Sequence, residues 1–343
     1  MVARAFITGL AGPALTPEER TFLRETQPWG FILFKRNIQT PSQVADLVEQ
    51  CRASINDPGA PVLIDQEGGR VQRLGPPHWP AYPPGGAYGK IYDSDATAGA
   101  AAARLGARLI AADLTALGID VDCLPVADVP AAKADPVIGD RAYGANPSKV
   151  SALAKAAAEG LLAGGVLPVV KHMPGHGRAN ADSHHKLPVV GADRATLDVT
   201  DFAAFRPLAN LPLGMSAHVV FTACDPHLPA TTSRTMIDQV IRKSIGFDGL
   251  LMTDDISMEA LKGSIGERTA AALAAGCDIV LHCNGKLDEM RQVAANAPLL
   301  TGKSAKRAAS ALAARRRPEP LDLPAARAEF ARMMGRSETV ARA

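Results

Sequence analysis

The chain carries little net charge and contains no long apolar stretch. Its 343 residues include 37 lysines and arginines against 35 aspartates and glutamates, which leaves a net charge of +2. Such a balance provides no long-range field that would hold a nucleic acid or an anionic membrane surface. No segment reaches the roughly 18 uncharged apolar residues that a transmembrane helix needs. We therefore expect a protein that binds neither nucleic acid nor membrane.

Cysteine is also scarce. The five cysteines are odd in number, widely spaced and without a Cys-x-x-Cys pair: Cys51, Cys123, Cys224, Cys277 and Cys283. A small disulfide-stabilised fold would place more cysteines at regular spacings. The first residues, Met1 to Phe6, lack the apolar region of a signal peptide. These features predict a reducing compartment and hence a cytoplasmic location.

Two motifs that would indicate a cofactor or a metal are missing. No Gly-x-Gly-x-x-Gly follows an early apolar run, which argues against a dinucleotide-binding fold. No His-Glu-x-x-His is present, and Pro174 between His172 and His176 forbids the regular helix that such a zinc site needs. We expect neither metal nor cofactor. A metal-dependent hydrolase remains an alternative, with zinc ligands drawn from His172, His176, Asp182 and His184.

Apolar residues make up 47 % of the chain, and eight short apolar runs recur along it. Most runs are continuous rather than alternating, as is typical of strands buried on both faces of a parallel sheet. Eight strands alternating with helices over about 300 residues predict a single-domain α/β fold, the (β/α)8 or TIM barrel. A doubly wound open sheet is the structural alternative. The runs are Ala5–Thr8, Gly30–Phe34, Pro61–Ile64, Ile119–Leu124, Val166–Val170, Leu213–Ala217, Gly249–Met252 and Cys277–Leu281.

Helix-compatible segments separate the runs. Thr40, Asn146 and Ser257 precede three of these segments, and their side chains suit the N-cap of a helix. We expect residues 1–317 to form the catalytic barrel and residues 318–343 to form a C-terminal helical tail. The clearest predicted helices are Pro41–Ile55, Ala96–Leu117, Ser148–Ala163, Ser233–Ser244 and Ser257–Ala275.

Polar residues gather where five of the apolar runs end. In a parallel barrel the C-terminal ends of all strands lie on one face, which is where active sites are built. Residues far apart in the sequence should therefore converge on one pocket. The polar run ends are Asp65-Gln66-Glu67-Gly68-Gly69-Arg70, Lys171-His172, His218, Thr253-Asp254-Asp255 and His282.

Two of these segments carry groups for covalent or acid–base chemistry. Asp254 directly follows a strand and should point into the pocket, where a carboxylate can attack carbon, bind a metal or act as a base. Its neighbour Asp255 is left to cap the next helix. In Asp182-Ser183-His184 the i, i+2 spacing can place a carboxylate against an imidazole nitrogen, which fixes the tautomer and raises the basicity of the ring.

A proline-rich segment over residues 76–86 follows the third run. Trp79 and Tyr82 within it offer flat apolar faces on which a sugar could stack. Inward packing of both aromatics in a rigid surface loop is an equal alternative.

Four motifs, in their order along the chain, resemble those of glycoside hydrolase family 3. The resemblance is to the bacterial cytoplasmic β-N-acetylhexosaminidases of peptidoglycan recycling, and it extends over about residues 5 to 290. The motifs are Asp65-Gln66-Glu67-Gly68-Gly69-Arg70-Val71-Gln72-Arg73, Ile138-Gly139-Asp140-Arg141-Ala142-Tyr143-Gly144, Lys171-His172-Met173-Pro174-Gly175-His176-Gly177 with Asp182-Ser183-His184, and Thr253-Asp254-Asp255-Ile256-Ser257-Met258.

The resemblance implies roles for the matching residues. Asp254 would be the nucleophile that forms a covalent glycosyl-enzyme, and His184 the general acid/base with Asp182 as its partner. His176 and His185 receive no firm role and are expected to be structural. The residues that would bind the sugar are Asp65, Arg73, Arg141, Lys171 and His172.

The activity that the resemblance implies is that of a retaining exo-β-N-acetylglucosaminidase. Its substrate would be a small carbohydrate, a muropeptide fragment such as GlcNAc-1,6-anhydro-MurNAc with or without peptide. A β-glucosidase or a β-N-acetylglucosaminide phosphorylase using the same residues is the alternative. We expect a monomer or a weak dimer.

Overall fold

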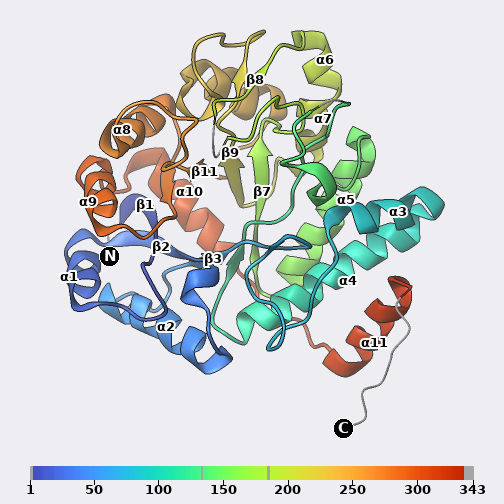
Figure 1. Cartoon of the computed structure of the whole chain (residues 1–343), viewed down its shortest axis with the longest axis horizontal. Helices are drawn as coiled ribbons and strands as arrows, with labels where there is room; N and C mark the ends of the chain where they lie inside the picture. The colour runs from blue at the N-terminus through green and yellow to red at the C-terminus, as the bar shows by residue number, and fades with distance from the viewer. Residues whose placement is uncertain (1–2, 133, 184–185, 336–343) are drawn as a thin grey trace.

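The structure, a computed structural model, describes residues 3–132, 134–183 and 186–335. Within these ranges eight parallel strands close into a barrel in the order β1-β12-β11-β9-β7-β6-β3-β2 (Figure 1). The prediction of a TIM barrel is confirmed, and the doubly wound alternative is wrong. Each predicted run overlaps one barrel strand: β1 Arg4–Gly9, β2 Pro28–Leu33, β3 Val62–Ile64, β6 Val121–Asp122, β7 Leu167–Met173, β9 Leu213–Ser216, β11 Leu250–Asp255 and β12 Ile279–His282.

Helices alternate with the strands and surround the barrel (Figure 1). Two short pairs of strands, antiparallel β4 Gln66–Gly68 with β5 Val71–Gln72 and parallel β8 Val189–Val190 with β10 Val220–Phe221, lie outside it. The α-helices are α1 Pro17–Thr26, α2 Pro41–Ser54, α3 Gly85–Ser94, α4 Ala96–Thr115, α5 Pro147–Ala163, α6 Arg194–Val199, α7 Asp201–Phe205, α8 Ile265–Ala275, α9 Leu287–Asn296, α10 Gly302–Ala313 and α11 Leu323–Met333.

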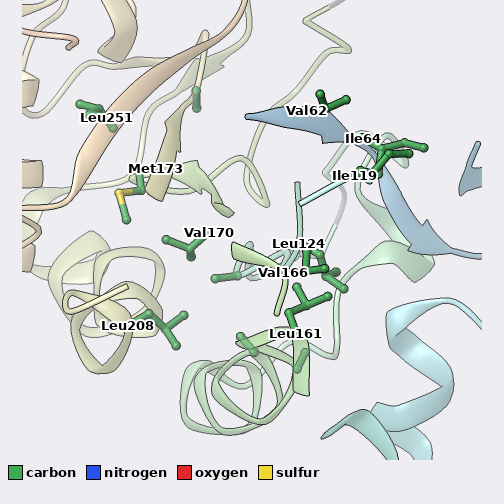
Figure 2. Packing of buried hydrophobic residues seen from close by; sticks show 14 of the residues in the cluster. Val62, Ile64, Ile119, Leu124, Leu161, Val166, Val170, Met173, Leu208 and Leu251 are labelled. Atoms are coloured by element: carbon green, nitrogen blue, oxygen red, sulfur yellow. The ribbon is translucent and has the colours of Figure 1, made fainter. Parts of the chain in front are cut away.

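Apolar side chains pack in two layers because neighbouring residues of a strand face opposite sides. On β7, Val169 belongs to the layer inside the barrel, whereas Val170 belongs to the layer between strands and helices. Figure 2 shows part of the outer layer, where Leu161 of α5 lies beneath Val166 and Val170. Burial of each such aliphatic side chain contributes about 1.5–3 kcal/mol to folding.

Helix α10 closes the N-terminal end of the barrel. Ala308 and Ala311 of this helix are buried in the same cluster as the side chains inside the barrel. Ser304 Oγ donates a hydrogen bond of 2.7 Å to Asp278, which directly precedes β12, and Arg307 pairs with the same carboxylate at 3.2 Å. The interior of the barrel is therefore filled by side chains and covered at this end, as is typical of TIM barrels.

The predicted caps hold at two of three helices. Thr40 accepts a hydrogen bond from the amide of Gln43, and Asn146 accepts bonds from the amides of residues 148 and 149. The prediction of a helix over Ser257–Ala275 is wrong in its first half, because α8 begins at Ile265. The Asp255 carboxylate accepts bonds from Ser257 N and Oγ and turns the chain there, whereas Ser264 forms the capping box of α8.

The segment predicted as a helix over Ser233–Ser244 is helical, but it is wound more widely than an α-helix. Residues Met236–Ile245 form a π-helix, and Gly246 ends it in the left-handed conformation with φ of 85°. Short 3₁₀ turns occupy Lys35–Asn37, Gly139–Arg141, Arg206–Leu208 and Ala230–Thr232. In the described ranges, no helix combines the length and the apolar character needed to cross a membrane.

Helix α11, within the segment predicted as a tail, lies against α4 (Figure 1). Its Phe330 is 8 % exposed, and the Phe330 ring centroid lies 6.3 Å from those of Tyr82 and of Tyr88. Arg327 pairs with the buried carboxylate of Asp113 at 2.7 Å. The division of the chain at residue 317 remains a prediction.

Substitution Phe330→Ala is expected to lower the free energy of unfolding by about 3 kcal/mol, because it removes a buried ring from the contact between α11 and the barrel. Urea denaturation measures this change. The control is Leu299→Ala, whose side chain is 47 % exposed and whose loss should cost at most about 0.5 kcal/mol. Equal effects for the two variants would mean that α11 adds nothing to the stability of the barrel.

Candidate active site

A cavity of about 270 Å³ lies at the C-terminal ends of the barrel strands. Every predicted site residue that the structure describes lines it, namely Asp65, Arg73, Arg141, Lys171, His172, Asp182 and Asp254. His184, the predicted acid/base, lies outside the described residues, as does His185. The structure thus brings together side chains from the ends of β3, β7 and β11 and from the loops that follow them. Their individual roles remain predictions.

A hairpin returns the chain to the pocket after β3. Gln66 holds this hairpin, because its Oε1 accepts bonds of 3.0 Å from the amides of Arg73 and Leu74. Gly68 has a φ of 92°, and a Cβ at this residue would lie 2.3 Å from the carbonyl oxygen of Pro83. The tight turn therefore requires glycine here. It carries Arg73 back to face Asp65.

A buried network of ion pairs forms one wall of the cavity. Lys171 Nζ lies 3.0 Å from Asp65 Oδ1 and 2.6 Å from Glu67 Oε1. Arg73 pairs with the other oxygen of Asp65 at 2.8 Å. Arg141 binds both oxygens of Glu67 at 2.8 Å in a bidentate pair. Each of the two carboxylates is therefore held by two cations.

The network keeps these groups charged despite their burial. Burial alone would raise the pKa of Glu67, but Lys171 and Arg141 lower this pKa to about 2. Burial is likewise offset for Asp65, whose pKa Lys171 and Arg73 hold well below its usual range. The two carboxylates in turn raise the pKa of Lys171 above its ordinary value. At neutral pH the wall offers anionic acceptors and cationic donors to the hydroxyl and amide groups of a sugar.

His172 is fixed by a carboxylate that sequence reasoning missed. Asp128, in the loop after β6, accepts a hydrogen bond of 2.7 Å from His172 Nδ1 and one of 3.2 Å from the His172 amide. Asp128 is fully buried, and the pKa of its carboxyl is about 2, because the histidine outweighs the cost of burial. A carboxylate at Nδ1 leaves Nε2 as the ring nitrogen available to a ligand. The signal for Asp128 was its position four residues beyond an apolar run.

Asp254 lies at the end of β11 and is 9 % exposed. Its Oδ1 accepts a hydrogen bond of 2.8 Å from the amide of Asp255. Burial alone would raise the pKa of Asp254, but His172 and His218 more than offset this effect and lower the pKa below its ordinary value. The carboxylate is therefore ionised at neutral pH, as a nucleophile must be.

Asp255, unlike Asp254, binds backbone amides with its side chain in two neighbouring segments. Its Oδ1 accepts hydrogen bonds from the amides of Ser257 at 3.0 Å and Cys283 at 3.1 Å. These bonds join the turn after β11 to the end of β12. The expectation that two successive aspartates divide their work is consistent with this geometry, although Asp255 shapes a turn and does not cap a helix.

Two of the polar run ends do not line the cavity. The neighbours of His282, Leu281 and Cys283, both line the cavity. Because side chains alternate along a strand, His282 points away from the cavity. Its Nε2 lies 3.3 Å from Glu289 Oε2. His218 is fully buried and its Nε2 donates a 2.9 Å hydrogen bond to the carbonyl oxygen of Asp255. The prediction that all five run ends meet in one pocket is wrong for these two histidines.

The aromatic residues of the proline-rich segment also lie outside the cavity lining. Trp79 is 8 % and Tyr82 is 4 % exposed, and the Tyr82 hydroxyl donates a 2.6 Å hydrogen bond to Asp113. The inward-packing alternative is confirmed, and sugar stacking on these two rings is wrong. The residues that line the cavity but were given no role from the sequence include Glu67, His176 and Ser183. The signal for Glu67 was its place two residues after Asp65, directly beyond an apolar run.

No group of three or more histidine, cysteine, aspartate or glutamate side chains within residues 3–132, 134–183 and 186–335 is arranged to hold a metal ion. The carboxylates of Asp65 and Glu67 instead face lysine and arginine side chains. A parallel barrel whose C-terminal face holds an ionised carboxylate beside charged, hydrogen-bonding walls has the architecture of a TIM-barrel glycosidase.

Comparison with known proteins gives the family. Residues 7–312 match the model of the glycosyl hydrolase family 3 N terminal domain, so the chain belongs to glycoside hydrolase family 3. A β-hexosaminidase of Alkalilimnicola ehrlichii is 39 % identical over 288 residues, which cover 83 % of this chain and 82 % of that protein. A β-hexosaminidase of Neisseria meningitidis is 39 % identical over 293 residues, with 82 % and 79 % covered.

The solved structures agree with the sequence comparison. NagZ from Neisseria gonorrhoeae, in complex with N-trifluoroacetyl-D-glucosamine, is similar with a TM-score of 0.87 and 32 % identity. The match covers 97 % of this chain and 99 % of that one. With its family and these similarities, the chain is a glycosidase of the β-N-acetylhexosaminidase type.

Proposed function

We propose that the protein is a retaining exo-β-N-acetylglucosaminidase that removes non-reducing terminal GlcNAc from peptidoglycan fragments. Its substrate is GlcNAc-1,6-anhydro-MurNAc, with or without peptide, and it acts in the cytoplasm as a monomer or weak dimer. The observation that carries the proposal is the ionised carboxylate of Asp254 in a cavity of about 270 Å³ walled by the Asp65–Lys171–Glu67–Arg141 network. Such a cavity suits a terminal sugar residue.

The relatives support the choice of sugar. The gonococcal protein was solved with an N-acyl glucosamine, and the curated relatives are β-hexosaminidases. In this chain, Asp65 and Glu67 would accept hydrogen bonds from the sugar hydroxyls. Arg73, Arg141, Lys171 and His172 would donate hydrogen bonds to the sugar and its N-acetyl group.

In the first step of the proposed reaction, Asp254 attacks the anomeric carbon while protonated His184 gives its proton to the glycosidic oxygen and becomes neutral. The bond to the aglycone breaks and a covalent glycosyl ester forms on Asp254. In the second step, water attacks the same carbon, gives its proton to His184 and releases Asp254 as a carboxylate. Two displacements at one carbon retain the configuration.

Histidine suits this acid/base role in a pocket that already holds several carboxylates. A neutral imidazole adds no further negative charge beside Asp65, Glu67 and Asp254, and its unperturbed pKa lies close to neutral pH. Asp182, which lines the cavity, would stabilise the imidazolium when it forms.

Hydrolysis of p-nitrophenyl glycosides tests this function. We expect kcat/KM for the β-GlcNAc substrate to exceed that for the β-glucoside by roughly 10²-fold or more, since charged groups of the wall would lose their partner in the N-acetyl group. Equal or higher activity on the glucoside would contradict the proposal. Free GlcNAc should be the product in phosphate buffer as well as in its absence. A sugar 1-phosphate would identify a phosphorylase.

A further inference from the structure

His176 joins the strand that bears the sugar-binding residues to the loop that bears the proposed acid/base. Its Nε2 lies 3.2 Å from the hydroxyl oxygen of Ser183, and both side chains are 3 % exposed. Ser183 stands between Asp182 and the position of His184 in the sequence. The contact is a side chain–side chain hydrogen bond in the lining of the active-site cavity.

The His176 end of this contact is anchored to the barrel. The Asp128 carboxylate accepts a 2.6 Å hydrogen bond from the His176 amide, and it also holds the ring of His172. One buried carboxylate therefore fixes both histidines, whose ring centroids lie 5.8 Å apart. The backbone at residue 176 is therefore fixed to the barrel.

The Ser183 end is also held by residues of the loop that follows β11. Its carbonyl oxygen accepts a 3.3 Å hydrogen bond from the amide of Ala260, and its hydroxyl lies 3.8 Å from the sulfur of Met258. Both partners belong to the segment between β11 and α8, which directly follows Asp254. Ser183 is thus bound on one side by His176 of its own loop and on the other by Met258 and Ala260 of the loop after β11.

The donor and the acceptor of each hydrogen bond between His176, Ser183 and Met258, here called the clamp, can be assigned. Burial lowers the pKa of His176 to about 4, so its ring is neutral at pH 7 and has a single N–H group. Nδ1 is buried and has no hydrogen-bond partner among the described residues. A buried ring nitrogen without a partner is tolerated better as a lone pair than as an N–H, so the proton belongs on Nε2. His176 then donates to Ser183, and Ser183 donates to Met258.

We propose that His176 is a positioning residue that, through Ser183, fixes the chain next to His184 so that this proposed acid/base can pass a proton to the leaving group. This inference rests on the proposed function and deepens it. It replaces the expectation that His176 is only structural. Removal of the clamp should therefore weaken proton donation while leaving Asp254 and the sugar-binding wall in place.

Dependence on the leaving group tests the proposal, because a 2,4-dinitrophenolate leaves without protonation and a phenolate does not. For His176→Phe and for Ser183→Ala, kcat/KM on phenyl β-GlcNAc should fall by about 10- to 100-fold. On the dinitrophenyl substrate kcat/KM should change by less than about threefold, because glycosylation there needs no acid. Azide should raise kcat of both variants on that substrate by replacing the water that needs a base.

Further variants make the test specific. His176→Gln, whose amide can donate from nearly the same place, should keep most of the activity on the phenyl substrate. The double variant should lose no more than the worse single variant, since both changes break one hydrogen bond. His227→Phe, an exposed histidine away from the cavity lining, serves as the control and should behave as the wild type.

Equal losses on the two substrates in folded variants would show a structural role for His176 and overturn the proposal. Unchanged activity on both substrates would overturn it as well. An inactive wild-type protein would instead contradict the proposed function, so the two failures are distinguishable.

Discussion

Substitution Asp254→Asn should lower kcat/KM for β-GlcNAc substrates by about 10⁴-fold or more, because it removes the carboxylate proposed as the nucleophile. Glu67 is bound on both oxygens by Arg141 and contacted by Lys171, whereas Asp255 is engaged in the turn after β11. The amide keeps the shape of the side chain. The variant should therefore still bind the sugar, and calorimetry with GlcNAc would measure that binding.

Mass spectrometry gives an independent test of the same residue. A fluorinated β-GlcNAc analogue with a good leaving group should label the wild-type enzyme on Asp254 and should leave Asp254→Asn unlabelled, since the glycosyl ester cannot form there. Label on Glu67 or Asp255 would reject the assignment of the nucleophile.

Substitution Lys171→Met should lower the free energy of unfolding by about 3–5 kcal/mol at pH 7, because it leaves two buried carboxylates with one cation each. Lys171 is 2 % exposed, and its Nζ lies within 3.0 Å of both Asp65 and Glu67. The same change removes a donor from the sugar-binding wall. Urea denaturation measures the first effect and KM the second.

The pH dependence of this loss has a definite sign. The pKa of Glu67 is lowered to about 2 from an ordinary value of 4.5, so its ion pairs stabilise the fold above pH 4.5 and lose this effect as pH falls toward 2. The gap in stability between wild type and Lys171→Met should therefore narrow below pH 4.5. Lys149→Met, which breaks a surface pair with Asp93, should cost at most about 1 kcal/mol. Equal costs for the two lysines would contradict the prediction.

The barrel strands could be predicted because parallel strands buried on both faces leave a simple trace in the sequence. The run Val166–Val170 is apolar throughout and ends in Lys171, so both the strand and its functional end are visible. The same logic located Asp65 and Asp254. These residues lie where the fold class itself places an active site.

Other parts of the site depend on information that a single sequence does not carry. His282 directly follows a run of apolar strand residues as Lys171 does, yet it faces the helices, because one residue of register decides which side of the strand a group faces. Asp128 binds the ring of His172, which is 44 residues away in the sequence. Tertiary packing brings the two residues together, so the pair could not be predicted from their spacing. The start of α8 was misplaced because Asp255 competes for the amide of Ser257.

The packed interior of the barrel, covered by α10, has a consequence for the order in which substrate binds and products leave. Side chains fill the barrel beneath the cavity and α10 covers its N-terminal end, so substrate and products exchange at the C-terminal face. In the proposed reaction, the aglycone would lie on the solvent side of the anomeric carbon and would have to leave before water reaches the glycosyl ester. The shape of the site would thus impose the same order on the two proposed steps as the chemistry does.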